Sequence, residues 1–576
     1  MNQKLENILN VSLDATEDEL RKAESLSTGY NWRDNTWEII VKYSGSLESI
    51  RNRYNVYIKE LLNYYAIIVA DKAAIELISQ EDVIDYVEKP KSLYYQIERT
   101  KTAACVGSVR ADGNILSGKG VIVGVIDTGI DIFDNAFRNS DGTTRILNIY
   151  DQTTGEKYDK QSIDEYIRLN EDLSGGTFSY DNAPGVDNIM HGTDVSYIAA
   201  GSLGVAYEAD IIAVKMGYSI NNQFPRTTSL MDAIDYIIRK AIEYRKPVAV
   251  NISYGCNYGA HNGNTLLESF IDDISKSYRC VICVGSGNEA DKAIHFGGII
   301  NTGQVQTAYL SVGEYQGAID IQIWKNYWDT IDVMLINPRG EQIGIITEGR
   351  INRYETYNTE IITLLGEPSP YNIYQEIYIN LIPKTDYILS GIWQIVLMAG
   401  SIRAGEYNIW LPSSQALGYA TAFNNPTADG TITIPATARN CIAVGAYNAY
   451  TNSYAAFSGR GFDNSIRNVN AGVKPDITAP GVDISIARQR GNDITYRNVT
   501  GTSYAVPVVT GAAALLMQWG IVMGNDRFMY GEKLKAALIN GSKPVGLVGI
   551  TRNDNQPDPR TGWGAVCLKN TLNKIL

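Results

Sequence analysis

Three residues in this chain are of the types that together turn a serine hydroxyl into a nucleophile: Asp127, His191 and Ser503. Each belongs to a short motif, DTG, HGT and GTS respectively, at the junction of an apolar strand or a loop with the next element. A hydroxyl is a weak nucleophile until an imidazole takes its proton, and a buried carboxylate on the other ring nitrogen fixes the imidazole tautomer. We therefore predict that Asp127 orients His191, that His191 is the general base, and that Ser503 attacks a carbonyl.

Each motif by itself indicates little. An Asp at a strand end is usually a turn residue, a single His is more often structural, and a Ser near a helix start is usually an N-cap. DTG also occurs in aspartic peptidases, but these need a second carboxylate in an equivalent turn, and no second DTG is present. The order Asp, His, Ser along the chain makes the combination specific, because one class of triad enzymes has this order.

The motifs lie among elements that are typical of a doubly wound α/β domain. The run GKGVIVGVIDTG is continuously apolar, as in a strand buried on both faces of a parallel sheet. Similar runs are ADIIAVKMG, KPVAVNISYG, RCVICVGSGNE and RNCIAVGAYN, with helical stretches such as SLMDAIDYIIRKAIEYR between several of them. This alternation predicts a mostly parallel sheet, which carries its sites at the C-terminal ends of its strands.

Changes of pattern divide the chain into four segments. Residues 1–96 have a compact strand–helix–strand pattern without a catalytic motif, which indicates a separate small α/β module. Residues 298–430 alternate apolar and polar positions between turn signals, which predicts an inserted antiparallel β-sandwich of the jelly-roll kind. Residues 97–297 and 431–576 are then the two parts of the α/β domain.

Composition limits the possible partners and location. The net charge of −13 argues against nucleic acid as the main partner, because phosphate binding needs a basic face. No stretch reaches the roughly 18 consecutive apolar residues of a membrane span. The N-terminus also lacks a basic segment followed by an apolar core, so no secretory signal is visible. We therefore expect synthesis in the cytoplasm and no membrane span.

The cysteines give no sign of a scaffold or a metal site. Six cysteines in 576 residues are too few for a disulfide scaffold, which fits a reducing compartment. Cys280 and Cys283 form a CxxC within CVICVGSGN, a run that predicts a buried strand on which they face opposite sides. A zinc knuckle would need a second ligand pair, and none is visible. We expect neither a metal nor another cofactor.

The sequence around the motifs resembles the subtilase family of serine peptidases. The blocks VIVGVIDTGID, HGTDVSYIAAG and GTSYAVPVVTGAAALL match the family's Asp, His and Ser blocks, and VGSGNEA matches a fourth. The resemblance implies that Asn288, in this fourth block, stabilises the oxyanion together with the backbone N–H of Ser503. It also implies that Ser253, Tyr254 and Gly255 form one wall of the S1 pocket and pair with extended substrate backbone.

Three positions depart from the residues that are usual in the family. Asp194 stands where many subtilases have a second His, Tyr504 follows the nucleophile in place of the common Met, and Val508 replaces another family His. None of these changes removes a catalytic group, but we expect them to alter packing near the site. Calcium is common in the family, yet none of its sites carries over to this sequence.

The insert, the small N-terminal module, the few cysteines and the missing signal peptide together resemble the clostridial spore-germination subtilases, the Csp group. The resemblance implies that residues 1–96 are a prodomain that first assists folding of the slow-folding parallel sheet and then blocks the site. It implies self-cleavage between Gln96 and Ile97, with the cleaved prodomain bound non-covalently. The implied substrate is the propeptide of a spore-cortex hydrolase zymogen, and the implied location is the spore.

Other functions stay open. A general intracellular or surface subtilase unrelated to spores would share this architecture, because a fold does not fix its substrate. A non-catalytic pseudoprotease with a signalling or scaffolding role is less favoured, because the chain keeps all three triad residues. The N-terminal module could instead be an interaction domain. For the insert, we favour a scaffold role over the docking of a protein substrate.

Overall fold

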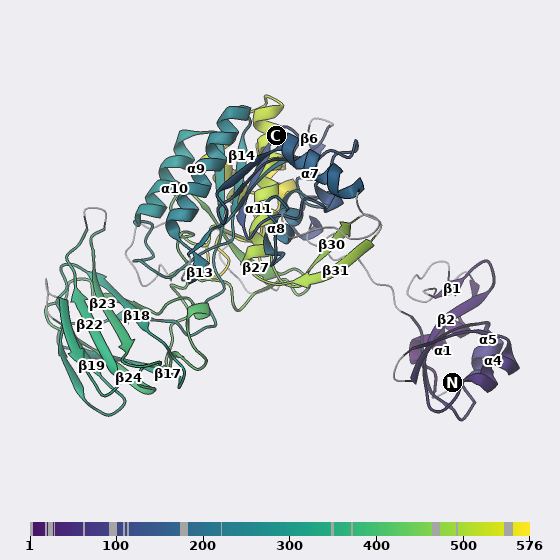
Figure 1. The fold of residues 1–576 in the computed structure, drawn as a ribbon, viewed down its shortest axis with the longest axis horizontal. Coiled ribbons are helices and arrows are strands. Elements are labelled where there is room, and N and C mark those ends of the chain that lie inside the picture. The colour runs from purple at the N-terminus through teal and green to yellow at the C-terminus, as the bar shows by residue number, and fades with distance from the viewer. Residues whose placement is uncertain are drawn as a thin grey trace. The chain divides into compact units, whose positions relative to one another are not determined.

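The computed structural model describes residues 4–90 and 101–576 with short gaps. The gaps are residues 18–19, 21–26, 28, 62–63, 108–109, 112–113, 173–182, 220–221, 347–350, 370–371, 463–472, 491–492 and 547–556. The chain divides into two compact units, Met1–Tyr95 and Gln96–Leu576 (Figure 1). The larger unit carries all three residues of the predicted triad.

The N-terminal unit is an antiparallel sheet covered by helices. Its strands are ordered β1–β2–β4–β3, with β5 also paired to β2. The strands are β1 (Tyr30–Asn31), β2 (Thr36–Tyr43), β3 (Tyr57–Leu61), β4 (Tyr65–Ala70) and β5 (Ile84–Glu88), and the described helices include α1 (Asn7–Asp14), α4 (Glu48–Tyr54) and α5 (Lys72–Ile78). Ile39 and Val41 of β2 pack with Ile50 of α4 and Ile75 of α5 in one core. The strand–helix–strand pattern predicted from the segments TWEIIVKYSG, SLESIRNRY, LNYYAIIVAD, AAIELISQ and VIDYVEK corresponds to β2, α4, β4, α5 and β5. The pattern did not indicate α1 and β3.

The larger unit is built on a mostly parallel sheet. Its order is β10–β9–β11–β8–β14–β15–β27–β28, with β29 beside β27. The strands are β8 (Ile122–Asp127), β9 (Ile146–Asp151), β10 (Glu156–Asp159), β11 (Asp210–Lys215), β14 (Val248–Ile252), β15 (Cys280–Gly285), β27 (Ile442–Asn448), β28 (Ser453–Tyr454) and β29 (Ile477–Pro480). Only the edge strands β10 and β28 pair antiparallel within it. The predicted doubly wound α/β fold is confirmed.

Helices cover both faces of this sheet (Figure 1). On one face lie α8 (His191–Ala200), α11 (Thr502–Met517), α12 (Gly531–Asn540) and α13 (Leu568–Ile575), and on the other lie α9 (Thr227–Tyr244) and α10 (Leu266–Ser277). Val123 and Val125 of β8 belong to the first core, whereas Ile122 and Ile126 belong to the second. Because successive strand residues point to opposite faces, a strand with two covered faces must be apolar throughout.

The inserted segment is a sandwich of two antiparallel sheets (Figure 1). One sheet has the order β16–β25–β18–β23–β22–β21, and the other has the order β20–β19–β24–β17–β26. The strands are β16 (His295–Ile299), β17 (Val305–Val312), β18 (Ile319–Asn326), β19 (Ile331–Ile336), β20 (Gln342–Ile345), β21 (Ile351–Glu355), β22 (Thr359–Leu365), β23 (Tyr374–Pro383), β24 (Gly391–Ala399), β25 (Glu406–Trp410) and β26 (Ala422–Phe423). Alternate residues such as Ile319, Ile321 and Ile323 fill a core between the sheets. The period-two pattern of the sequence therefore corresponds to one buried face on each strand.

Buried polar and aromatic contacts join the sandwich to the α/β domain. Trp410 is 1% exposed and stacks between His261 and His295, with ring centroids 4.2 and 4.9 Å away. The carboxylate of Glu289 accepts hydrogen bonds from the backbone N and the Oγ of Ser414, at 3.1 and 3.3 Å. These contacts fix the sandwich to the α/β domain at several points, and its scaffold role stays a prediction.

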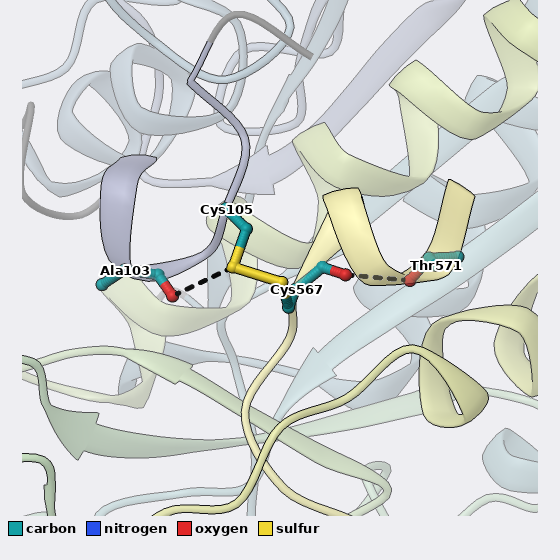
Figure 2. The surroundings of a disulfide bond; sticks show 4 residues. All are labelled: Ala103, Cys105, Cys567 and Thr571. Carbon is teal, nitrogen blue, oxygen red and sulfur yellow. Dashed lines mark hydrogen bonds between the residues drawn. A yellow bond between two sulfur atoms is a disulfide. The ribbon is translucent and has the colours of Figure 1, made fainter. Parts of the chain in front are cut away.

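A disulfide connects segments from the two ends of the larger unit (Figure 2). Cys105 and Cys567 are 462 positions apart in the sequence, with their Cα atoms 4.8 Å apart. Beside the bond, the N–H of Leu568 in α13 donates to the carbonyl oxygen of Ala104 at 3.1 Å. The low cysteine count predicted no disulfide scaffold and gave no sign of this single long-range bond. The free cysteines among the described residues are Cys256, Cys280, Cys283 and Cys441.

Cys280 and Cys283 of β15 belong to different cores, so they face opposite sides of the sheet as predicted.

One helical stretch is long and apolar. In the described part of the chain, Thr502–Val522 alone has the length and composition of a membrane span, and most of it is buried inside the protein. It is the central core helix of the α/β domain.

Candidate active site

Asp127 and His191 lie side by side where a strand and a helix meet. Asp127 is the last residue of β8, and His191 is the first residue of α8. Oδ1 of Asp127 is 2.6 Å from Nδ1 of His191, and Asp127 is 1% exposed. A buried carboxylate at Nδ1 favours the tautomer with the proton on Nδ1, which leaves Nε2 free to accept one. The structure brings these two predicted residues together in the relation that a triad needs.

The glycines of the two motifs allow this close approach. Gly129 has a φ of +133°, and a Cβ there would lie 2.4 Å from the carbonyl oxygen of Gly185. A Cβ on Gly192 would lie 2.3 Å from the carbonyl oxygen of Gly129 and 2.9 Å from Cβ of Asp127. No side chain fits at either position, so packing requires the glycine in DTG and in HGT.

A second buried carboxylate, Asp187, which no sequence motif indicated, links the two motifs. Oδ1 of Asp187 accepts hydrogen bonds from Oγ1 of Thr128 at 2.8 Å and from the N–H of Met190 at 2.7 Å. Oδ2 of Asp187 accepts from the N–H and Oγ1 of Thr193, at 2.8 and 2.7 Å. Asp187 is 2% exposed, so these bonds satisfy a carboxylate that water cannot reach. Thr128 lies 59 positions from Asp187, and local spacing therefore carries no signal for this link.

Ser503 lies in the first turn of α11, beside α8. The ring of Tyr504, the next residue, contacts the ring of His191 with a centroid distance of 5.2 Å. Ser503 is therefore the sequence neighbour of a residue that contacts His191, and it is partly exposed. The N–H groups of a first helical turn have no partner within the helix, so the N–H of Ser503 is available to a substrate oxygen.

Asn288 is held next to the start of the same helix. Its Oδ1 accepts hydrogen bonds from the N–H and Oγ1 of Thr502, at 3.0 and 3.1 Å. With the oxygen occupied in this way, Nδ2 is the atom of the amide that can donate to a substrate. The Nδ2 of Asn288 and the N–H of Ser503 are the two donors of the predicted oxyanion hole, and that role stays a prediction.

The predicted S1 segment follows β14 and lies beside the nucleophile. Oγ of Ser253 donates to the carbonyl oxygen of Ser503 at 3.4 Å. Gly255 is exposed, and a Cβ on it would lie 2.4 Å from Oγ1 of Thr433. Tyr254 lies between them and is partly exposed. The segment has the position that a substrate-binding wall needs, and its contact with a substrate stays a prediction.

The charges around His191 favour its protonated form. Burial by itself lowers the pKa of His191, but the Asp127 carboxylate, with help from Asp187 and Asp194, outweighs burial and raises the pKa above its ordinary value. A general base must be neutral to accept a proton. The neutral, active form of His191 therefore dominates only at a higher pH than for an isolated imidazole.

The predicted cleavage position, Gln96 and Ile97, lies outside the described residues. Within the part of the chain that the structure describes, no group of three or more His, Cys, Asp or Glu side chains is arranged to hold a metal ion.

Family models match most of the chain. The model of the subtilase family matches residues 118–363 and 404–564, and the model of the Csp protease B prodomain matches residues 3–91. The chain therefore belongs to the subtilase family of serine endopeptidases, and it carries a prodomain of the Csp type.

A solved structure supports the same relationship. The structure of the Clostridium perfringens CspB protease is similar to this chain with a TM-score of 0.74 and 34% sequence identity, over 82% of this chain and 96% of that one. The resemblance to the Csp proteases that the sequence suggested is confirmed.

Curated relatives match a smaller part of the chain. They include the subtilase-type proteinase RRT12 of Saccharomyces cerevisiae, 33% identical over 128 residues, and subtilisin-like protease 10 of Arthroderma otae, 34% identical over 120 residues. These matches span 22% and 21% of this chain, and 23% and 27% of the relatives. They support the protease class and, because of their short length, carry no statement about the substrate.

The arrangement fits the roles that the sequence predicts for peptide hydrolysis. In these roles His191 takes the proton of Ser503 as Oγ attacks the peptide carbonyl, and Asp127 stabilises the imidazolium that forms. We expect Nδ2 of Asn288 and the N–H of Ser503 to stabilise the oxyanion. We expect His191 then to give its proton to the leaving amine and to activate the water molecule that releases the acyl group from Ser503.

Proposed function

We propose that the protein cuts itself after Gln96 and that it then activates a spore-cortex hydrolase during germination by removing the propeptide of that enzyme. The similarity to the CspB protease, over 82% of this chain, is the observation that carries this proposal. Synthesis in the cytoplasm and packaging into the spore belong to the same proposal.

Two observations support the position of self-cleavage. The match to the Csp prodomain model ends at residue 91, and the boundary between the two compact units lies between Tyr95 and Gln96. A junction between two separately folded units is the kind of segment that a protease can reach, because few contacts cross it. The freed prodomain then stays bound as a non-covalent partner.

A serine variant tests self-cleavage. Wild-type protein should separate into two chains, whereas Ser503→Ala should remain a single chain of 63.5 kDa. Ser453→Ala, at an exposed serine, is the matched control and should split as the wild type does. Mass spectrometry of the large fragment should find Ile97 at its N-terminus. Equal splitting of wild type and Ser503→Ala would show that another protease makes the cut.

A separate assay tests the substrate. The matured protein should shorten a purified cortex-hydrolase zymogen at its N-terminus, and Ser503→Ala should not. If the protein matures but leaves the zymogen intact, the general protease is the better interpretation. Expression restricted to sporulating cells supports the germination role, and expression throughout vegetative growth argues for the general protease.

A further inference from the structure

A buried acid with two arginine partners lies one helical turn after the catalytic histidine. Asp194 is fully buried within α8. Arg488 donates from Nε to Oδ1 of Asp194 at 3.0 Å, and its Nη2 contacts the same oxygen. Arg497 pairs with Oδ2 of Asp194 at 2.7 Å. Both arginines come from one hairpin, β30 (Ile484–Arg490) and β31 (Asp493–Val499).

Arg488 also contacts the residue before the catalytic histidine. Its Nη2 donates to the carbonyl oxygen of Met190 at 2.9 Å. Met190 has a φ of +66°, a left-handed conformation that a side chain of this kind adopts only under external constraint. One planar guanidinium thus bonds the backbone on one side of His191 and the side chain of Asp194 on the other.

Arg497 connects the same acid to the aromatic neighbour of the histidine ring. Burial raises the pKa of Tyr504, and the guanidinium of Arg497 beside its hydroxyl opposes that shift. The ring of Tyr504 packs against the ring of His191, with the two planes inclined by 54°. Arg497 therefore pairs with Asp194, and its charge acts on Tyr504, whose ring packs against His191.

We propose that Asp194, Arg488 and Arg497 form a positioning cluster that fixes the start of α8 and thereby the ring of His191. None of the three is a catalytic residue, because each acts through Met190, Tyr504 or α8. The cluster joins two of the positions at which this chain departs from common subtilases, Asp194 and Tyr504. An acid at the first position and a hydroxyl at the second give the two arginines their partners.

The charges of the positioning cluster also affect the pKa of His191. Of the groups that face His191, Asp127, Asp187 and Asp194 raise its pKa. Removing the charge of Asp194 should therefore lower the pKa of His191. Removing Arg488 leaves Asp194 less neutralised and should raise it.

The test measures how fast Ser503 reacts with a fluorophosphonate probe, as a function of pH, in the full-length chain. The rate per folded molecule reaches a plateau once His191 is neutral. Arg488→Gln should lower this plateau about tenfold to hundredfold, because a small displacement of the base has a large effect on rate. The labelling rate rises with pH as His191 loses its proton, and we call this rising part of the profile the acid limb. Arg488→Gln should also move the acid limb to higher pH, and Asp194→Asn should move it to lower pH. The labelled band is recorded for each variant, so that a change in self-cleavage is seen separately.

A matched control separates positioning from stability. Arg490 lies on the same strand as Arg488 but pairs with Asp131, at 2.7 Å from Nε. Arg490→Gln should leave both the plateau and the limb where they are in the wild type. If Arg488→Gln and Arg490→Gln show the same plateau rate and the same position of the acid limb, the proposal is overturned. Arg488→Lys keeps the charge without the two-point geometry, so full recovery of the plateau in this variant would also overturn it.

A second variant keeps the test decisive if Arg488→Gln does not fold. The side chain of Arg497 is 42% exposed, so its replacement should cost little stability. Arg497→Gln should still lower the plateau, because it removes the cation that pairs with Oδ2 of Asp194. A wild-type plateau and limb in this variant would then contradict the proposed role.

Discussion

Nδ1 of His191 lies 2.6 Å from Oδ1 of Asp127, although 64 positions separate the two residues. We predict that Asp127→Asn lowers kcat about 10⁴-fold, because an amide at this place favours the wrong imidazole tautomer. Asp273→Asn, at a side chain that is 79% exposed, is the control and should behave as the wild type does. Hydrolysis of a peptide ester, scaled to the number of folded molecules, measures both. A loss below tenfold at Asp127 would contradict the assigned role.

The raised pKa of His191 gives a prediction for pH dependence. Because the base must be neutral, kcat/KM should rise with pH through an apparent pKa above the ordinary value of 6.5. The same shift affects folding. A raised pKa in the folded state stabilises the protein below the unfolded pKa, and this contribution is lost as the pH rises through the folded value. An acid limb at or below pH 6.5 would show that burial, and not Asp127, dominates the environment of the ring.

The role of Asn288 predicts a selective loss of rate. Asn288→Ala should reduce kcat by about 10²–10³, equivalent to about 2.7–4 kcal/mol, with little change in KM, because the lost donor acts only when the oxyanion forms. Asn288→Asp keeps the oxygen that Thr502 binds but replaces the donor with a negative charge, so it should lose more rate than Ala. If the two variants instead raise KM and leave kcat unchanged, Asn288 binds the ground-state substrate.

The disulfide predicts a thiol count and a stability change. Denatured wild-type protein should show four reactive thiols without reductant and six with it. The double variant Cys105→Ser with Cys567→Ser should lose about 2–5 kcal/mol of unfolding free energy while keeping its kcat, since the bond lies outside the catalytic site. Cys256→Ser, at a free cysteine, is the control for the substitution itself. Six thiols without reductant would show that the bond does not form.

The joint between the sandwich and the α/β domain predicts a different kind of loss. Trp410→Ala removes a ring that is buried between His261 and His295, and it should destabilise the protein by about 3–5 kcal/mol. Trp328→Ala, at a ring that is 44% exposed, should change stability by no more than about 0.5 kcal/mol. Denaturant unfolding compares the two. Equal stability of both variants would argue against a rigid joint.

Most strands and helices could be predicted from the sequence, because the patterns that indicate them lie within short segments. The apolar run that ends in Asp127 predicted β8, because a strand that is buried on both faces has apolar residues throughout. The alternating segments predicted the sandwich, because a strand that is buried on one face has apolar residues at every second position. Short elements at the edges were harder: β3 and α1 have mixed patterns that local periodicity does not resolve.

The sequence alone determined the residue types of the triad, their order, and the glycines that let their segments meet. Tertiary structure decided which groups support the triad, namely Asp187 between the two motifs and the two arginines on Asp194. It also decided that Cys105 and Cys567, away from the site, form a bond. The physical reason is that hydrogen bonds, ion pairs and disulfides depend on distance in space. A segment hundreds of residues away, such as the hairpin that carries Arg488, can be a direct neighbour of the catalytic helix with no trace in local spacing.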